Sequence, residues 1–172
     1  ITSAGNKLLF TGVTRATYAD KEFQVATIAA SANFFDFFTF PLSEGNPEEV
    51  LMQKNSVLIS EEVARVFFPE GDAIGKTINV YENNSYTGAF PGRNFSDVDI
   101  DLAVTGVFSK FPKTIFKEAD IIINIDMYHE QQENMFQGMM YLQEFHFLRL
   151  NEAGSSDDVS KQLNGSLNNT VL

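Results

Sequence analysis

The residues of this sequence whose types and spacing could support chemistry begin with a glycine–lysine–threonine triplet. Residues 71–77 read Gly-Asp-Ala-Ile-Gly-Lys-Thr and are similar to a phosphate-binding loop. That motif requires a glycine five residues before Gly75, where this sequence has Glu70. Its triplet must also open a helix whose free N–H groups hold the phosphate. Residues 77–81 instead have the character of a strand, so we expect a turn that leads into a strand and no nucleotide site.

Alternating aspartates suggest a second kind of site, one for calcium. Asp97, Asp99 and Asp101 match the first positions of a calcium-binding loop, but that loop requires glycine at its sixth position and glutamate at its twelfth. The sequence has Leu102 and Phe108 at those positions. The same alternation fits the solvent-exposed side of a strand, where charges discourage pairing with another chain. We favour the strand interpretation.

Metal and hydrolytic sites find little support elsewhere in the sequence. A zinc site without cysteine would need both histidines, His129 and His146, together with a carboxylate. Glu144 and His146 would share a strand face, which favours a local pair over a metal site. The sequence has no Gly-x-Ser-x-Gly motif, and carboxylate pairs carry no weight in a chain with 23 acidic residues. We therefore predict a non-enzymatic chain with no catalytic, cofactor-binding or metal-binding residues.

Two apolar segments could contact a partner. Residues 33–40 carry five phenylalanines, which either pack between a sheet and a helix or form an exposed docking patch. We favour the packed core for this cluster. Flexible thioether side chains suit adaptable surfaces, and a later segment is rich in them. We therefore predict a partner or cargo surface at Met135, Phe136, Met139 and Met140.

Composition limits the classes of partner. The chain of 172 residues has a formal net charge of −11, which disfavours nucleic acid because affinity for phosphates comes from lysine and arginine. No window reaches the roughly 18 consecutive apolar residues that a membrane helix needs. The chain begins at Ile1 without the basic and apolar regions of a signal peptide. We expect it to be a piece excised from a longer protein.

The spacing of apolar residues predicts an α+β fold. A short apolar strand at 57–59 is followed by Ser60, whose hydroxyl can accept a hydrogen bond from a first-turn N–H. The helix after Ser60 has one apolar stripe and ends near Pro69. The other expected strands are 7–12, 22–29, 76–82, 97–108, 119–126 and 143–150, with a loop at 83–96, a helix or loop at 128–140 and a helix at about 157–167.

Taken in order, several segments resemble the MacB-like periplasmic core domain. That domain is inserted between the first two membrane helices of MacB/FtsX-type ABC transporter permeases. The resemblance extends from about Phe23 to Leu167, and the Phe- and Asn-rich composition is similar to that of permeases from Bacteroidetes. Two features depart from the family pattern: the opening strand and helix before Lys7 are absent or short, and the insertion at 83–99 is long. The segments that carry the resemblance are the aromatic stretch 29–45, the strand–Ser–helix unit 56–68, the Ile-Gly-Lys turn within 73–78, the Gly-Val strand and proline of 104–112, the strand 120–123, and the closing strand and helix 144–150 and 157–167.

The resemblance implies a two-lobed α+β domain. A porter-like βα lobe would comprise about 1–50 and 141–172, and an inserted mixed or β-rich lobe about 51–140. The family carries no catalytic residues in this domain. Its members couple ATP hydrolysis by a cytoplasmic ATPase, in a separate subunit or domain, to motion of the periplasmic domain.

The resemblance also implies where the chain lies and what it binds. Flanking helices absent from this chain would anchor it on the periplasmic side of the inner membrane, as a dimer in the full-length protein. Its partners would be the ABC ATPase, reached through the full-length permease, and a periplasmic or outer-membrane protein, with no nucleic acid.

Two other functions stay open from the residues alone. A free-standing secreted or periplasmic binding module for glycans or peptides would have a signal peptide and no second membrane span. A small hydrolase would use paired carboxylates, with Asp97, Asp99 and Asp101 as the residues to test.

Overall fold

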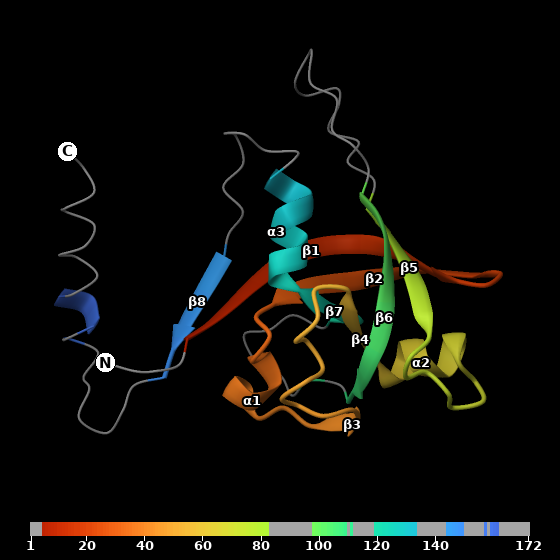
Figure 1. Ribbon diagram of the computed structural model, residues 1–172, viewed down its shortest axis with the longest axis horizontal. Helices are drawn as coiled ribbons and strands as arrows, with labels where there is room; N and C mark the ends of the chain where they lie inside the picture. The colour runs from red at the N-terminus through yellow and green to blue at the C-terminus, as the bar shows by residue number, and fades with distance from the viewer. Residues whose placement is uncertain are drawn as a thin grey trace, which may run out of the picture.

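Strands that pair around a closed ring dominate the fold (Figure 1). The computed structural model describes residues 5–82, 98–109, 111, 119–133, 144–149, 157 and 159–161, and the last four of these are helical. In chain order the elements are β1 (Gly5–Tyr18), β2 (Lys21–Ala30), α1 (Phe34–Phe38), β3 (Leu42–Glu44), β4 (Ser56–Ser60), α2 (Glu61–Phe67), β5 (Thr77–Glu82), β6 (Val98–Phe108), β7 (Ile121–Asn124), α3 (Ile125–Glu133) and β8 (Glu144–Leu148).

The ring is closed by the long β1–β2 hairpin. Strands β2, β7, β4, β6, β5 and β1 pair in that order, and β1 also pairs with β2. The β2–β7 and β4–β6 pairs are parallel, and the other pairs of the ring are antiparallel. Beside the ring, β8 pairs with the first residues of β1, and β3 pairs with the last residues of β6.

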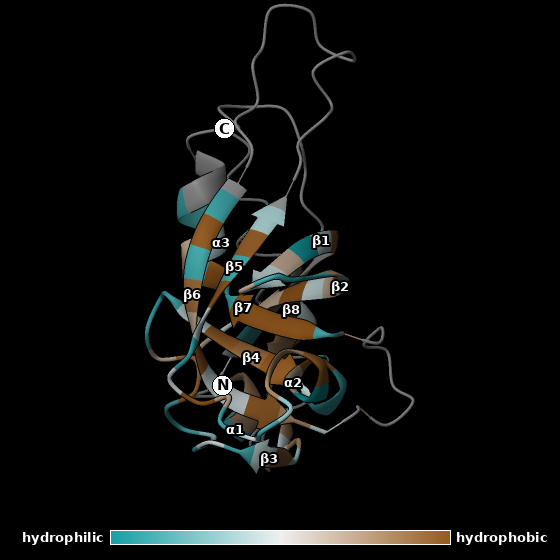
Figure 2. Ribbon diagram, turned by 90° about the vertical axis from the view of Figure 1, so that its right-hand side faces the viewer, coloured by the Kyte–Doolittle hydropathy of each residue, from teal (hydrophilic) through white to brown (hydrophobic). Residues whose placement is uncertain are grey.

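The core has two parts, one on each side of the strands. One cluster draws alternate residues from all six ring strands, such as Val57 and Ile59 of β4, and therefore fills the inside of the ring. A second cluster lies outside, where Leu58 and Ile122 pack with Phe34 and Phe35 of α1. Figure 2 shows the consequence: β7 is hydrophobic up to its last residue, Asn124, whereas β6 is banded, as expected for a strand with one solvated side. The packed-core prediction is confirmed for these two phenylalanines.

A β-bulge in β6 changes which residues of the strand point into the ring. Val104 pairs with Val57 of β4, but the next pair joins Gly106 to Leu58, so Thr105 is an extra residue. The Thr105 hydroxyl donates to the carbonyl of Val50 at 2.5 Å. Because of this insertion, the strand after the bulge again directs an apolar residue into the ring.

The sequence around Ser60 predicted the position of α2 correctly. The Ser60 hydroxyl accepts from Val63 N–H at 3.3 Å, which confirms the predicted N-cap. The buried side chains of α2 are Val63 and Phe67. Lys21, at the tip of the β1–β2 hairpin, donates from Nζ to the carbonyls of Val66 and Phe67 at 2.7 and 3.0 Å. A cation at a helix C-terminus is favourable, so the hairpin tip is tied to α2.

Other expectations need correction. The first strand runs to Tyr18, beyond the predicted 7–12, because β2 pairs with it along almost its whole length. The strand predicted at 119–126 ends at Asn124, because that side chain caps α3 by accepting from the N–H groups of the next helical turn.

Some expectations fall partly or wholly outside the described residues. The loop at 83–96 is one, and most of the helix at 157–167 is another. The division into two lobes stays a prediction. Among the helices that the structure describes, none is long and apolar enough to cross a membrane.

Thr39 gives a prediction about stability. It ends α1 with a left-handed φ of 53°, which is unfavourable for a β-branched residue, while its N–H donates to the carbonyl of Phe35 at 2.8 Å. We expect Thr39→Gly to raise the free energy of unfolding by about 1 kcal/mol, measured by urea denaturation. Thr77→Gly, in the extended strand β5, is the matched control and should lower stability by about the same amount. Equal losses in both variants would contradict the prediction.

Candidate functional site

Four neighbouring strands present a polar surface on the outside of the ring. The register aligns β2, β1, β5 and β6 so that side chains with the same orientation form two rows across the strands. We call these eight residues the polar face: Gln24, Arg15, Tyr81 and Asp99 in one row, and Glu22, Thr17, Asn79 and Asp101 in the other.

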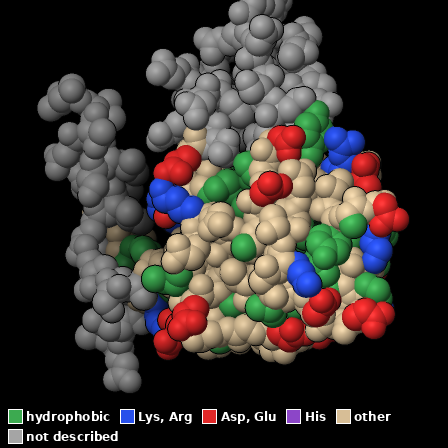
Figure 3. Space-filling model, turned by 45° about the vertical axis from the view of Figure 1, so that its right-hand side comes forward, with side chains coloured by type: hydrophobic (Ala, Val, Ile, Leu, Met, Phe, Trp, Pro, Cys, Tyr) green, Lys and Arg blue, Asp and Glu red, His purple; other side chains and the backbone are tan. Residues whose placement is uncertain are grey.

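Strand alternation explains why these residues point outward. Their neighbours along each strand, such as Ala16, Val25, Val80 and Leu102, are buried in the inner cluster. Successive side chains of a strand lie on opposite sides, so burial of one set exposes the other. On the side of the molecule seen in Figure 3, acidic side chains are scattered around the surface and hydrophobic ones form small separate groups.

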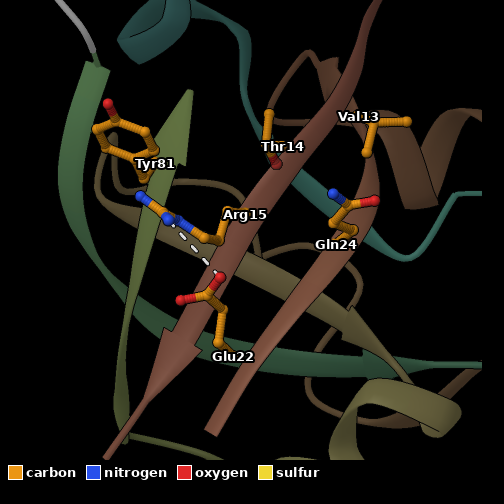
Figure 4. A pocket seen from close by; sticks show the side chains of 6 residues that line it. All are labelled: Val13, Thr14, Arg15, Glu22, Gln24 and Tyr81. Carbon is orange, nitrogen blue, oxygen red and sulfur yellow. Dashed lines mark ion pairs between the residues drawn. The ribbon is translucent and has the colours of Figure 1, made fainter. Parts of the chain in front are cut away.

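At the centre of the polar face, a guanidinium group is held between a ring and a carboxylate (Figure 4). The Arg15 Cζ atom lies 4.4 Å from the centre of the Tyr81 ring, and Nη1 lies 3.6 Å from Glu22 Oε1. The Arg15 and Glu22 side chains are 43% and 60% exposed, so this ion pair contributes little stability. Stacking on the ring does fix the plane of the guanidinium and its donors.

A cavity of about 310 Å³ lies beside this group. It is lined by Val13, Thr14, Arg15, Glu22, Gln24 and Tyr81. Val13 is 68% exposed, which adds an apolar contact to the polar groups. The Thr14 hydroxyl is engaged with the Thr27 hydroxyl at 2.6 Å. Donors, acceptors and one apolar side chain in this arrangement suit non-covalent recognition.

The acidic end of the polar face is organised by an amide. Asn79 Nδ2 donates to Asp99 Oδ1 at 2.6 Å and to Asp101 Oδ1 at 3.1 Å. Both aspartates are exposed on an extended strand. The strand interpretation of these aspartates is therefore confirmed, although Asp97 lies outside the described residues.

The glycine–lysine–threonine triplet lies in the turn that the sequence predicted. Gly75 has a φ of 81°, and β5 begins at Thr77, so no helix follows the triplet. Lys76 Nζ lies 2.9 Å from Asp72 Oδ2. This hydrogen bond raises the pKa of Lys76 and lowers the pKa of Asp72. The predicted turn that leads into a strand is therefore confirmed.

The other residues that the sequence singled out are not brought into one site. His129 lies in α3 and His146 in β8. Within the described ranges, no three histidine or acidic residues are grouped so that they could hold a metal ion. Met135, Phe136, Met139 and Met140 lie outside the described residues, so the predicted surface there stays a prediction.

The polar face was not predicted from the sequence. The alternation in β6 was recognised, but Arg15 and Glu22 gave no motif, because they become neighbours only through the hairpin register. The one usable signal was the polar alternation of residues 13–17 and 22–26 on either side of a short turn.

A second cavity, of about 230 Å³, lies at the start of α2, where Glu61 accepts two hydrogen bonds. The Ser43 and Ser109 hydroxyls donate to its carboxylate, the latter at 2.9 Å, and these bonds lower the pKa of Glu61. The cavity is lined by three carboxylates, Glu61, Glu62 and Asp120, against the single cation Arg65, and the Glu61 carboxylate is already engaged with Ser43 and Ser109. We therefore regard it as structural.

Glu61 gives a prediction about pH dependence. A carboxyl group whose pKa is lower in the folded state stabilises the fold above its unfolded pKa and loses that contribution as the pH falls through the folded pKa. Glu61→Gln should therefore be less stable than the wild type at pH 7, and the difference should vanish in acid, well below about pH 4. Glu62→Gln removes the adjacent charge and leaves both serine contacts, so it is the control. Thermal melts of both variants across pH would contradict the prediction if the two profiles were the same.

Comparison with known proteins identifies relatives of the chain. The family model of the MacB-like periplasmic core domain matches residues 4–165. A domain of a protein described as a permease of Porphyromonas gingivalis matches with a TM-score of 0.69 and 21% identity, over 98% of this chain and 70% of that chain.

Two further solved structures are similar. The periplasmic region of MacB from Actinobacillus actinomycetemcomitans gives a TM-score of 0.61 at 14% identity, over 98% of this chain and 67% of that one. The extracellular domain of the noncanonic ABC-type transporter YknZ from Gram-positive bacteria gives 0.55 at 13% identity, over 93% and 70%. No curated protein matches the sequence. At these identities the structural matches establish a shared fold.

Proposed function

Because the chain belongs to the MacB-like periplasmic core domain family, we propose that it binds cargo or partner proteins and moves when a cytoplasmic ATPase hydrolyses ATP. As a MacB-like periplasmic domain of an ABC-type transporter permease, it lies on the extracytoplasmic side of the inner membrane. The ATPase would belong to a separate subunit or domain. Membrane helices on either side of this chain would link the two, and two copies of the permease would assemble in the transporter.

The polar face is the observation that carries the binding role. Arg15 and Tyr81 are of the types that dominate protein–protein recognition, and their mutual stacking at 4.4 Å orients both before a partner arrives. The cavity beside them offers Gln24 and Val13 as further contacts. The chemistry of these side chains is that of a binding surface, which supports a non-catalytic role.

The closed ring supports the mechanical role. Each of its six strands pairs on both sides along at least part of its length, and the inner cluster fills the space between them. A close-packed interior of this kind transmits displacement with little compression. A push on one strand, or on the hairpin that Lys21 ties to α2, would move the ring as a body.

Site-specific photo-crosslinking in the full-length transporter, in its native cells, tests the binding role. A photoreactive residue at Val13, beside the polar face, should capture a cargo or partner protein. The control position is Leu148 in β8, which pairs with Gly5 near the other end of β1 and is 46% exposed. The eight residue steps from Gly5 to Val13 in β1 put the two positions roughly 26 Å apart along the strand. No adduct at Val13, or the same adducts at both positions, would contradict a role for this face.

A further inference from the structure

The first half of β6 has a strand on only one side. β5 pairs with residues 98–103 of β6, whereas β4 pairs only with residues 103–108. In the part of the chain that the structure describes, no strand lies on the β4 side of residues 98–102. The ring therefore has an open strand edge along residues 98–102 of β6, just before the residues that pair with β4.

Hydrogen bonds at the end of this segment fix the direction of its main-chain groups. Ala103 N–H donates to the carbonyl of Asn55, just before β4, at 2.8 Å. Val104 makes its bonds on the opposite side, to the carbonyl of Lys76 and the N–H of Gly75, each at 2.8 Å. The orientation alternates along a strand. The N–H and C=O groups of Asp99 and Asp101 therefore point into the open edge, while those of Ile100 and Leu102 bond to β5.

The side chains beside this edge carry negative charge. Asp99 and Asp101 are exposed at the end of the polar face, and both accept from Asn79 Nδ2. Between them, Ile100 packs against the inner cluster. A strand added here would place every second side chain directly opposite an aspartate. Opposite charges at facing positions of paired strands are favourable.

We propose that an extended segment of a partner protein adds to this edge as a strand, with lysine or arginine at every second position facing Asp99 and Asp101. Main-chain bonds to the two aspartate residues would give affinity, and the alternating basic side chains would give selectivity. A second copy of this chain is a poor occupant, because each copy carries a net charge of −11 and the two would repel. This inference rests on the proposed binding function and specifies the chemistry of the partner.

The experiment uses this chain and a synthetic probe. The probe is a decapeptide of alternating lysine and threonine with blocked ends, and its counterpart has glutamate in place of lysine. Amide chemical shifts of the isotope-labelled chain report binding, and hydrogen exchange reports protection. In the free chain, the amides of Asp99 and Asp101 should exchange fast. The lysine probe should shift and protect them, and the glutamate peptide should do neither.

Variants separate the main-chain contribution from the charge. Asp101→Pro removes an N–H that points outward and leaves the ladder to β5 intact, since proline is tolerated at such positions. It should weaken probe binding by more than about ten-fold. Asp101→Asn keeps the N–H and removes the charge, so it should weaken binding by about two- to five-fold. Methylation of alternate main-chain nitrogens of the probe should abolish binding without any change to the protein.

Several results would overturn the inference. Slow exchange of the Asp99 and Asp101 amides in the free chain would show that the edge is already covered, by this chain or by a second copy. If the lysine probe bound Asp101→Pro as tightly as the wild type, main-chain pairing would not contribute. The same would follow if the methylated probe bound as tightly as the unmethylated one, and attraction between surface charges alone would then explain the binding. Absence of binding by the lysine probe would also reject it. None of these results bears on whether ATP moves the domain, which is measured separately in the full-length transporter.

Discussion

Replacement of Phe34 by alanine is expected to lower the free energy of unfolding by about 4 kcal/mol. The Phe34 side chain is fully buried, with its ring centre 5.2 Å from that of Phe35 and 5.1 Å from that of Phe38. Further ring contacts at 5.7 and 6.2 Å reach Phe40 and Phe111. Removal of the ring leaves a cavity that the surrounding rings can fill only by giving up their own packing contacts.

Urea denaturation of Phe34→Ala measures this effect, and Phe23→Ala is the control. Phe23 also contacts another ring, that of Phe67 at 6.2 Å, but its side chain is 45% exposed. Its removal should cost about 1 kcal/mol. Comparable losses in the two variants would contradict the placement of residues 33–40 as the outer core and would favour an exposed docking patch.

Replacement of Gly45 by alanine is expected to cost about 3 kcal/mol. Gly45 has a φ of 107°, which side chains rarely adopt, and an added Cβ would lie 2.9 Å from the carbonyl oxygen of Thr105. The same atom would lie 2.8 Å from a methyl group of Val50 and 3.1 Å from the Cα of Gly106. The obstacles are largely main chain at the bulge of β6, so they cannot rotate away.

Gly71→Ala separates backbone strain from overlap in this comparison. Gly71 also has a positive φ, of 81°, but nothing lies within 4 Å of an added Cβ. The control should therefore lose only about 1 kcal/mol. If Gly45→Ala is no less stable than Gly71→Ala, the result would contradict the close packing of Gly45 against the main chain at the bulge of β6.

Local chemistry made parts of the fold predictable. The Ser60 cap and the strand alternation of β6 need only neighbouring residues, and both are confirmed. Asn124 shows the limit of such reasoning. It is the last residue of β7, where its Oδ1 caps α3 and its Nδ2 donates to the carbonyl of Leu51 at 2.7 Å. The second contact joins segments 73 residues apart, and no local pattern contains it.

The candidate site was unpredictable for a related reason. The polar face exists because Arg15 faces Gln24 on one side and Tyr81 on the other. A shift of either pairing by one residue would turn these side chains into the ring and expose the core. The family resemblance predicted the class of protein, but it names no binding residues. Arg15 and Tyr81 are recognised as neighbours only from the pairing of β1 with β5.

The bulge at Thr105 illustrates how one residue changes the faces of a strand. Strict alternation from Val104 would point Gly106 and Phe108 into the ring. The extra residue instead places Val107 in the inner cluster and Phe108 in the outer one, against Phe35. A sequence pattern of period two could not anticipate this change, because the insertion depends on pairing with β4.

The distance between two copies of this domain in the assembled transporter, with and without ATP, is the direct test of whether ATP hydrolysis moves the domain. The chain contains no cysteine, so Met52→Cys, at a side chain that is 61% exposed, gives one spin-label site per copy of the domain. In the full-length permease with its ATPase, we expect one distance distribution without nucleotide and a displaced one when ATP is bound and hydrolysis is blocked, with return to the first after hydrolysis. The same distribution in every nucleotide state, while the ATPase hydrolyses ATP at its normal rate, would contradict the proposal that ATP hydrolysis moves this domain.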